Sequence, residues 1–283
     1  MLGRNIYIKN DPKFNNSFNV LIFFKSVIDV INCTNLILLS RCTSFSKLQP
    51  IYENNDYLVN ILHFISTTGY TIIFEISFLI SFSRFVAVCV PLRYNRLISN
   101  MQLNIYVFIS IVIGLIIGSI SATYSSEYVY DKKTEKMLPV YVDSTSSYFI
   151  TIYTLGLYLP LTVISFIMNS ITIHCLRHKY TLDSKEKRME VNLQIFSVIS
   201  LIVFILFESV YMLRAFAFFL NSPKLMILGQ EILPFLVDAA TYGLLYVSIA
   251  TTPQLRRMFI SRRKNMASIT VQPKDNIFYH NRE

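Results

Sequence analysis

Charged side chains inside long apolar segments are the residues of this sequence most able to do chemistry. Lys25 and Asp29 are four residues apart, so on a helix they share one face and can form an ion pair. Asp238 stands in another apolar segment and is followed by Tyr242. In one interpretation Lys25 and Asp29 simply satisfy each other. In the other, Asp29, Asp238 and Tyr242 form a polar switch core, where two neighbouring acids would favour a sodium ion or a shared proton.

Patterns typical of enzymes are missing from the sequence. It contains no HExxH motif, no catalytic carboxylate pair and no nucleophile motif. The four cysteines have neither CxxC spacing nor a histidine at metal-ligand spacing, and a lone cysteine in an apolar segment usually packs as a small apolar side chain. We therefore expect no catalytic residue, no resident metal and no cofactor.

Six long apolar stretches must position these polar residues. Hydrophobic residues make up 53% of the 283 residues and charged residues only 15%, against about 25% charged in a soluble domain. A membrane-spanning helix needs about 20 mostly apolar residues to cross about 30 Å of hydrocarbon. The stretches that qualify are 18–40, 57–90, 103–123, 148–176, 191–217 and 228–251. The sequence predicts an all-α membrane protein, a single bundle over residues 1–283 with six spans and water-exposed loops between them.

The distribution of Lys and Arg predicts the orientation of the bundle. Of these residues, 18 fall on one side of the expected spans and 6 on the other, and cytoplasmic loops carry the excess. Both termini are then cytoplasmic, and the tail 252–283 begins with a basic amphipathic helix. Anionic lipids of the inner leaflet account for the net charge of +9, so we expect a membrane-lipid partner and no nucleic acid.

The end of the second stretch and the residues that follow it read SRFVAVCVPLRYNRLIS, which places Arg84 at a helix end. Alone, such an arginine could snorkel to the lipid headgroups, but Pro91 cannot continue a regular helix and marks a defined loop with Leu92 and Tyr94. The segment resembles the Asp-Arg-Tyr motif and following loop of rhodopsin-like G-protein-coupled receptors. Ser83 stands where that family usually has an acid, so the usual restraint on the arginine is absent.

The resemblance extends along the chain and implies a rhodopsin-like seven-helix bundle. Asp29 and Pro160 match the acid of the second helix and the proline of the fifth, while Asp238 to Tyr242 resemble the Asn/Asp-Pro-x-x-Tyr segment, with Ala239 in place of proline. These positions fit if the first helix of the family is missing. The sequence has no Trp, and no Cys is placed to form the usual outer disulfide. It looks most like the nematode serpentine chemoreceptors, class V or a relative.

This resemblance implies a chemosensory receptor that binds a small odorant or pheromone and activates a heterotrimeric G protein. Its place would be the plasma membrane, as a multi-pass protein, for example in sensory-neuron cilia. The residues implied in G-protein coupling are Arg84, Pro91, Leu92 and Tyr94. A six-helix transporter or channel is the alternative, but the internal repeats typical of transporters are not visible. A truncated receptor that does not signal is a further alternative.

Small polar side chains in the outer half of the span 57–90 are candidates for ligand binding. Ser66, Thr67 and Tyr70 are spaced to share one helix face and could hydrogen-bond a small molecule. They could equally form hydrogen bonds between helices. Glu208 either lines the ligand cavity or packs without a ligand role. His63, near the membrane interface, is expected to be a boundary residue.

Overall fold

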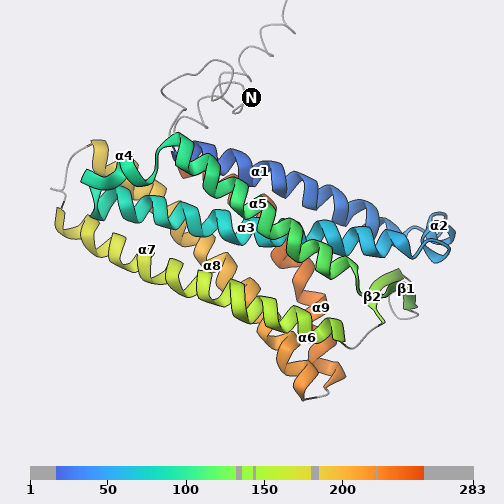
Figure 1. Ribbon diagram of the computed structural model, residues 1–283. Coiled ribbons are helices and arrows are strands. Elements are labelled where there is room, and N and C mark those ends of the chain that lie inside the picture. The colour runs from blue at the N-terminus through green and yellow to red at the C-terminus, as the bar shows by residue number, and fades with distance from the viewer. Residues whose placement is uncertain (1–16, 132–135, 143–144, 180–184, 221, 252–283) are drawn as a thin grey trace, which may run out of the picture.

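Long helices lying side by side make up most of the described structure, a computed structural model (Figure 1). It describes residues 17–131, 136–142, 145–179, 185–220 and 222–251. The first half contains α1 (Ser17–Leu36), the π-helical turn η2 (Ile37–Arg41), η3 (Cys42–Ser44), α2 (Gln49–Glu53), α3 (Tyr57–Cys89), η4 (Pro91–Arg93), α4 (Tyr94–Leu97) and α5 (Asn100–Ala122). The second contains strands β1 (Ser126–Asp131) and β2 (Lys136–Tyr141), then α6 (Thr145–Tyr153), η5 (Thr154–Tyr158), α7 (Leu159–Lys179), α8 (Lys185–Phe219), α9 (Pro223–Asp238), η6 (Ala239–Gly243) and α10 (Leu244–Thr251).

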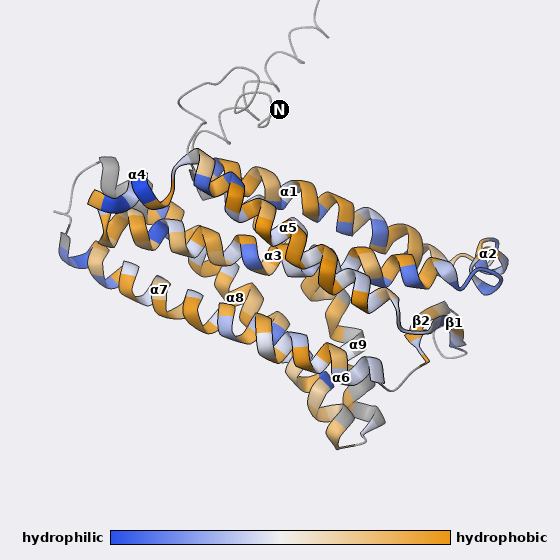
Figure 2. Ribbon diagram, viewed as in Figure 1, coloured by the Kyte–Doolittle hydropathy of each residue, from blue (hydrophilic) through white to orange (hydrophobic). Residues whose placement is uncertain are grey.

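Five helical segments of the described chain are long and apolar enough to cross a membrane. They are Phe18–Ser44, Tyr57–Cys89, Met101–Ala122, Thr145–His178 and Val191–Ala217. Figure 2 shows hydrophobic residues along these helices. The sixth expected span, 228–251, falls on α9, η6 and α10, which follow one another without a break. The expectation of an all-α membrane bundle is confirmed. The expected tail helix after residue 251 lies outside the described residues.

Helix ends follow local sequence signals. Ser99 and Gln102 form a capping box at the start of α5, in which the Ser99 hydroxyl accepts from the Gln102 backbone N–H and the Gln102 side chain accepts from the Ser99 backbone N–H. Pro91 follows the end of α3 and opens a 3-10 turn, as expected for a residue that cannot donate a backbone hydrogen bond.

The central helix of the bundle is α3, which packs against α1, α5, α7 and α8. Its contact with α5 depends on two glycines four residues apart, because a Cβ at Gly114 would stand 2.7 Å from Ile72 Cγ1 and one at Gly118 would stand 2.8 Å from the Phe64 carbonyl oxygen. Small residues at this spacing allow helices to approach closely in a membrane, where lipid provides no hydrophobic drive for helix association.

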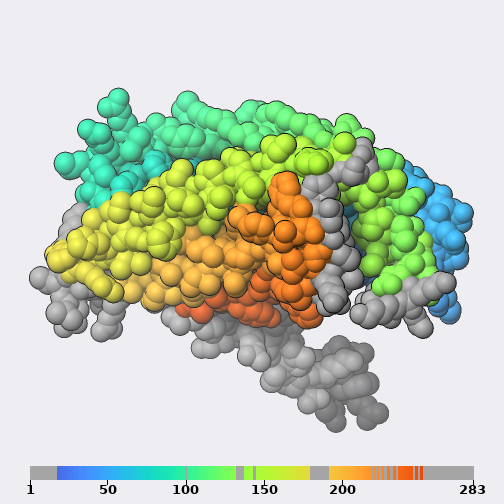
Figure 3. All heavy atoms as spheres, turned by 90° about the horizontal axis from the view of Figure 1, so that it is seen from below, coloured from blue at the N-terminus to red at the C-terminus, as the bar shows by residue number. Residues whose placement is uncertain are grey.

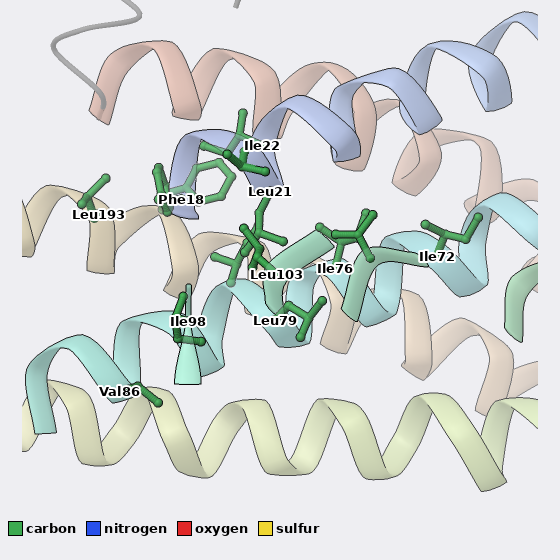
Figure 4. Close-up of a cluster of buried hydrophobic side chains, with 14 residues drawn as sticks. Phe18, Leu21, Ile22, Ile72, Ile76, Leu79, Val86, Ile98, Leu103 and Leu193 are labelled. Carbon is green, nitrogen blue, oxygen red and sulfur yellow. The ribbon is translucent and has the colours of Figure 1, made fainter. Parts of the chain in front are cut away.

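The largest hydrophobic cluster joins α1, α3, α5 and α8 (Figure 4). It lies toward the end of the bundle that carries η4 and α4, which we call the Arg84 end. The buried members labelled in the figure are Phe18, Leu21, Ile22, Ile72, Ile76, Leu79, Val86, Ile98, Leu103 and Leu193.

At the opposite end, which we call the hairpin end, the segment after α5 forms an antiparallel β-hairpin instead of the plain loop expected from the sequence. The register pairs Ser126 with Tyr141 and Asp131 with Lys136. Charged residues at the strand ends obscured the alternation of side chains that marks a strand. The hairpin lies beside α2 and over the end of α3.

Candidate functional site

Arg84 is buried on α3, with only 5% of its surface exposed. Its guanidinium carbon lies 5.2 Å from the centre of the Phe18 ring at the start of α1, within the range of a cation–π interaction. The Phe18 ring in turn meets Phe196 of α8 edge to face, at 5.5 Å between centres. The arginine is therefore enclosed by the bundle, and not extended toward lipid headgroups as snorkelling would require.

Ser83 does not restrain Arg84 as the acid of the family would. It is fully buried, and its hydroxyl donates to the Ile80 carbonyl of its own helix at 2.9 Å. The Phe18 ring is one contact of Arg84 that the sequence did not predict.

The other residues predicted to contact a G protein lie just beyond α3. Pro91 and Leu92 belong to η4, and Tyr94 begins α4. Tyr94 is half-buried against the large hydrophobic cluster, whereas Leu92 is 99% exposed. The structure places these residues at the Arg84 end but does not bring Leu92 into the core with Arg84. Their part in coupling stays a prediction.

Lys25 and Asp29 form the buried ion pair expected from their spacing, with 2.7 Å between Nζ and Oδ2. They line a groove of about 280 Å³ between α1 and the segment η6–α10. In the same groove, the Tyr242 hydroxyl and the Cys33 thiol are 2.9 Å apart. Lys25 and Asp29 therefore satisfy each other, as the first interpretation has it.

Asp238, the third member of the predicted switch core, has a different partner. Arg41 of η2 donates to its carboxylate at 2.6 Å, and both side chains are about half exposed. The structure thus brings Asp29 and Tyr242 to one groove and pairs Asp238 with Arg41. No group of three or more His, Cys, Asp or Glu side chains that could hold a metal occurs in the described part of the chain.

The three candidate ligand residues on α3 contact three different neighbours. Ser66 accepts a hydrogen bond from Asn35 of α1 at 3.0 Å. The Thr67 hydroxyl is 3.0 Å from the Ser121 hydroxyl of α5. Tyr70 packs against Phe207 of α8, with ring centres 5.9 Å apart. Ser66 and Thr67 thus form the bonds between helices that the sequence offered as the alternative, and a ligand role for them stays a prediction.

The hairpin is fastened to the bundle by hydrogen bonds and ring stacking. The Tyr141 ring stacks on His63 with centres 3.9 Å apart, and its hydroxyl is 2.8 Å from the Ser121 hydroxyl. Ser126 donates to the Asn60 side chain of α3. Burial raises the pKa of Tyr141. His63 therefore has the hairpin as its neighbour, and its place at the membrane boundary stays a prediction.

A second set of contacts joins the hairpin and α2 to the end of the first span. The Tyr128 hydroxyl donates to the Leu39 carbonyl at 2.6 Å, and the Tyr52 hydroxyl donates to the Leu38 carbonyl at 2.5 Å. Burial raises the pKa of Tyr128. None of the four cysteines forms a disulfide, so these contacts do the tethering.

A cluster of amides and hydroxyls inside the bundle was not predicted from the sequence. The Asn169 side chain of α7 donates to Ser81 of α3 at 3.0 Å and accepts from Gln194 and Ser197 of α8, each at 2.8 Å. All four residues are buried. The available signal was the presence of an Asn and a Gln inside apolar stretches, because such amides in a membrane usually bind a neighbouring helix.

Glu208, the fourth candidate ligand residue, lies on α8. It is buried on α8 and lines a cavity whose other walls come from α7 and α8. Glu75, a second buried acid, hydrogen-bonds the Ser110 side chain of α5. Ser66 and Thr67 contact α1 and α5, whereas Tyr70 contacts Phe207, the residue that precedes Glu208 on α8.

The long apolar helices define a multi-pass membrane bundle, and several of its buried polar groups join neighbouring helices. Residues 5–227 match the family model of the serpentine type 7TM GPCR chemoreceptor Srx. This match covers well over half of the sequence, so the chain belongs to the Srx family of nematode serpentine chemoreceptors. The prediction of such a chemoreceptor is confirmed, with Srx as the class where the sequence suggested class V or a relative.

The family is one of receptors and not of enzymes, and its members in general take small-molecule ligands and G proteins as partners. No curated protein matches the chain closely enough to add a relative.

Proposed function

We propose that this chain is a chemosensory receptor of the plasma membrane that binds a small odorant or pheromone and activates a heterotrimeric G protein. The observation that carries the proposal is the burial of Arg84 against Phe18 on the central helix. An arginine with only a headgroup-anchoring role would extend to the interface. Arg84 is instead buried inside the bundle, and a change in helix packing could expose its charged side chain.

The transition between resting and active states would be a population shift. A ligand favours the active state only by as much as it binds that state more tightly. In the proposed active state α1 and α8 move away from the end of α3, so that Arg84 is freed from Phe18 and reaches the G protein. Leu92, fully exposed beside the central helix, is the second contact that the resemblance implies.

The proposed orientation places the Arg84 end in the cytoplasm. Arg93 and Arg96 are exposed at this end, beside the segment that resembles the coupling loop of the family. The excess of basic residues in the loops on this side supports the same orientation. The hairpin would then face the outside, where a ligand arrives.

The proposal is tested by measuring G-protein activation in cells that express the full chain, during exposure to a panel of volatile alcohols, amines, esters and short-chain acids. At least one compound should raise activation above that of untransfected cells. The variant Arg84→Ala should lose this response at equal surface expression, whereas Arg96→Ala, which removes an exposed arginine of the same end, should keep it. Normal signalling by Arg84→Ala would contradict the role given to this arginine.

A further inference from the structure

A cavity of about 490 Å³ lies between α7 and α8. The two helices run side by side in Figure 3, α7 in yellow-green and α8 in orange. Most of the lining is apolar, and rim residues such as Val163, Phe166 and Phe216 are each about half exposed on the outer surface of the bundle. In a membrane this surface faces lipid, so the cavity is open to molecules dissolved in the bilayer.

Two polar groups in the cavity lining have no hydrogen-bond partner within the described structure. Glu208 is 4% exposed, and neither of its carboxyl oxygens is hydrogen-bonded. Thr162, 7% exposed on the facing helix, has an unbonded hydroxyl. A buried polar group without a partner destabilises the protein, and a charged group does so more strongly. Asp29 is paired with Lys25, and one oxygen of Glu75 lacks a hydrogen bond, whereas both carboxyl oxygens of Glu208 lack one.

We propose that this cavity binds a lipophilic small molecule carrying one hydrogen-bond donor group, a hydroxyl or an amine, which donates to the Glu208 carboxyl. The Thr162 hydroxyl lies in the same lining and provides a second polar contact. The apolar part of the molecule fills the space beside Val163, Phe166 and Phe216. The inference rests on the proposed function and deepens it, because it names a place and a chemical class for the ligand.

The position of Glu208 along its helix argues against an ordinary lipid as the intended occupant. The span Val191–Ala217 continues for nine residues beyond Glu208, which is about 14 Å at 1.5 Å per residue. A lipid headgroup at the interface is too far away to reach the carboxyl. An acyl chain can reach the carboxyl but carries no hydrogen-bond donor. The Glu208 carboxyl and the Thr162 hydroxyl would then remain buried without a partner, which is unfavourable.

The cavity is placed where an occupant can alter the spacing of α7 and α8. Further along the same two helices, Asn169 of α7 and Gln194 of α8 are joined by a hydrogen bond of 2.8 Å. A molecule bound between the helices at Glu208 would change their spacing and so lengthen or shorten this hydrogen bond. Asn169 also donates to Ser81, so the change would reach the central helix.

The test uses the purified full chain in lipid nanodiscs and three photoreactive probes. They share a ten-carbon chain with a diazirine and end in a hydroxyl, an amine or a methyl ether. The alcohol and the amine should label the α7 and α8 segments that line the cavity, and excess decan-1-ol should compete. The ether, which has no donor, should label them at least tenfold more weakly. Equal labelling by all three probes would show a groove for bulk lipid and overturn the proposal.

Variants assign the labelling to Glu208. Glu208→Leu should reduce labelling by the alcohol and the amine at least tenfold, while Glu208→Gln, which removes the charge but keeps an acceptor, should weaken the amine more than the alcohol. Val163→Trp at the rim should block all probes. Glu75→Gln is the matched control, since it alters a buried acid outside the cavity, and should leave labelling unchanged. Unchanged labelling of Glu208→Leu would refute the inference. Because labelling needs no G protein, failed signalling with intact labelling would count against the proposed function alone.

Discussion

The Arg84 guanidinium lies 5.2 Å from the centre of the Phe18 ring, and this contact joins the last part of the central helix to the first residues of α1. The segment resembles that of rhodopsin-like receptors, in which an acid usually precedes this arginine, and here that position is Ser83. An aromatic ring is a weaker restraint than a carboxylate in a dry site, since a cation–π contact contributes about 0.5–2 kcal/mol. The Phe18 ring therefore adds a small contribution to the stability of the resting state.

Replacing Phe18 with leucine should raise ligand-independent G-protein activation. The change keeps an apolar side chain but removes the ring, and a loss of about 1 kcal/mol shifts a two-state equilibrium about fivefold. Basal activation in cells measures the effect. Phe24→Leu, the same change at a ring of α1 that contacts Phe23 instead, should have no comparable effect. A Phe18→Leu variant with unaltered basal activity would remove the ring from the account of the resting state.

Replacing Asp29 with asparagine should lower the thermal stability of the protein. Lys25 would keep its buried charge and lose its carboxylate, and breaking a buried ion pair costs about 3–5 kcal/mol. The double variant Lys25→Met with Asp29→Leu should recover most of that loss, because it removes both charges. A thiol-reactive dye can follow unfolding through the free cysteines. Equal melting temperatures for the single and double variants would contradict this explanation.

Replacing Asn169 with alanine should weaken the packing of α7 and α8 against the central helix and lower the stability of the protein. Three hydrogen bonds to Ser81, Gln194 and Ser197 would be lost, at about 0.6 kcal/mol each on average in a membrane, or about 2 kcal/mol together. Thermal unfolding in detergent measures the loss. Ser170→Ala is the control, since the Ser170 hydroxyl is exposed and donates to the Phe166 carbonyl of its own helix. A similar effect of both changes would exclude a special role for the cluster.

Replacing Tyr128 with phenylalanine should loosen the hairpin. Only the hydroxyl is lost, together with its bond to the Leu39 carbonyl, which contributes about 1 kcal/mol. Hydrogen exchange of the β1 amides should become about fivefold faster, because local opening is easier. Tyr130→Phe alters a half-exposed tyrosine of the same strand and should leave exchange nearly as in the unchanged protein. Protection that is the same in both variants would mean that the hydroxyl does not hold the strand.

Engineered glycosylation should report the orientation of the bundle. Asp131→Asn combined with Lys133→Thr creates an acceptor sequence between the two strands, and this site should be glycosylated in cells if the hairpin faces outside. The natural sequon that begins at Asn15 should stay unmodified on the cytoplasmic side. Mobility before and after glycosidase treatment distinguishes the two. Glycan at Asn15 would reverse the orientation.

The sequence predicts the parts of this fold that depend on local chemistry. The lengths of the apolar stretches predict the spans, Pro91 marks the end of α3, and the spacing of Lys25 and Asp29 predicts their ion pair. Contacts between distant segments are harder to predict. Phe18 is one of 22 phenylalanines, and none of its neighbours in sequence marks it as the partner of Arg84.

The same reason applies to Arg41 and Asp238, which are 197 residues apart in the sequence. One interpretation of the sequence places Asp238 beside Asp29, because both are acids within apolar stretches. The sequence does not show that Arg41 lies close to Asp238 in the fold. Only the packing of the first span against η6 and the end of α9 brings the two charges together.

The way in which the hairpin is attached determines which changes in its surroundings can loosen it. The bonds of Ser126, Tyr128 and Tyr141 fasten it without sulfur. A disulfide is a covalent bond that breaks only by reduction or by exchange with a thiol. Noncovalent bonds open and close by thermal fluctuation. The cover over this end of the receptor should therefore respond to temperature and be indifferent to the redox potential of its surroundings.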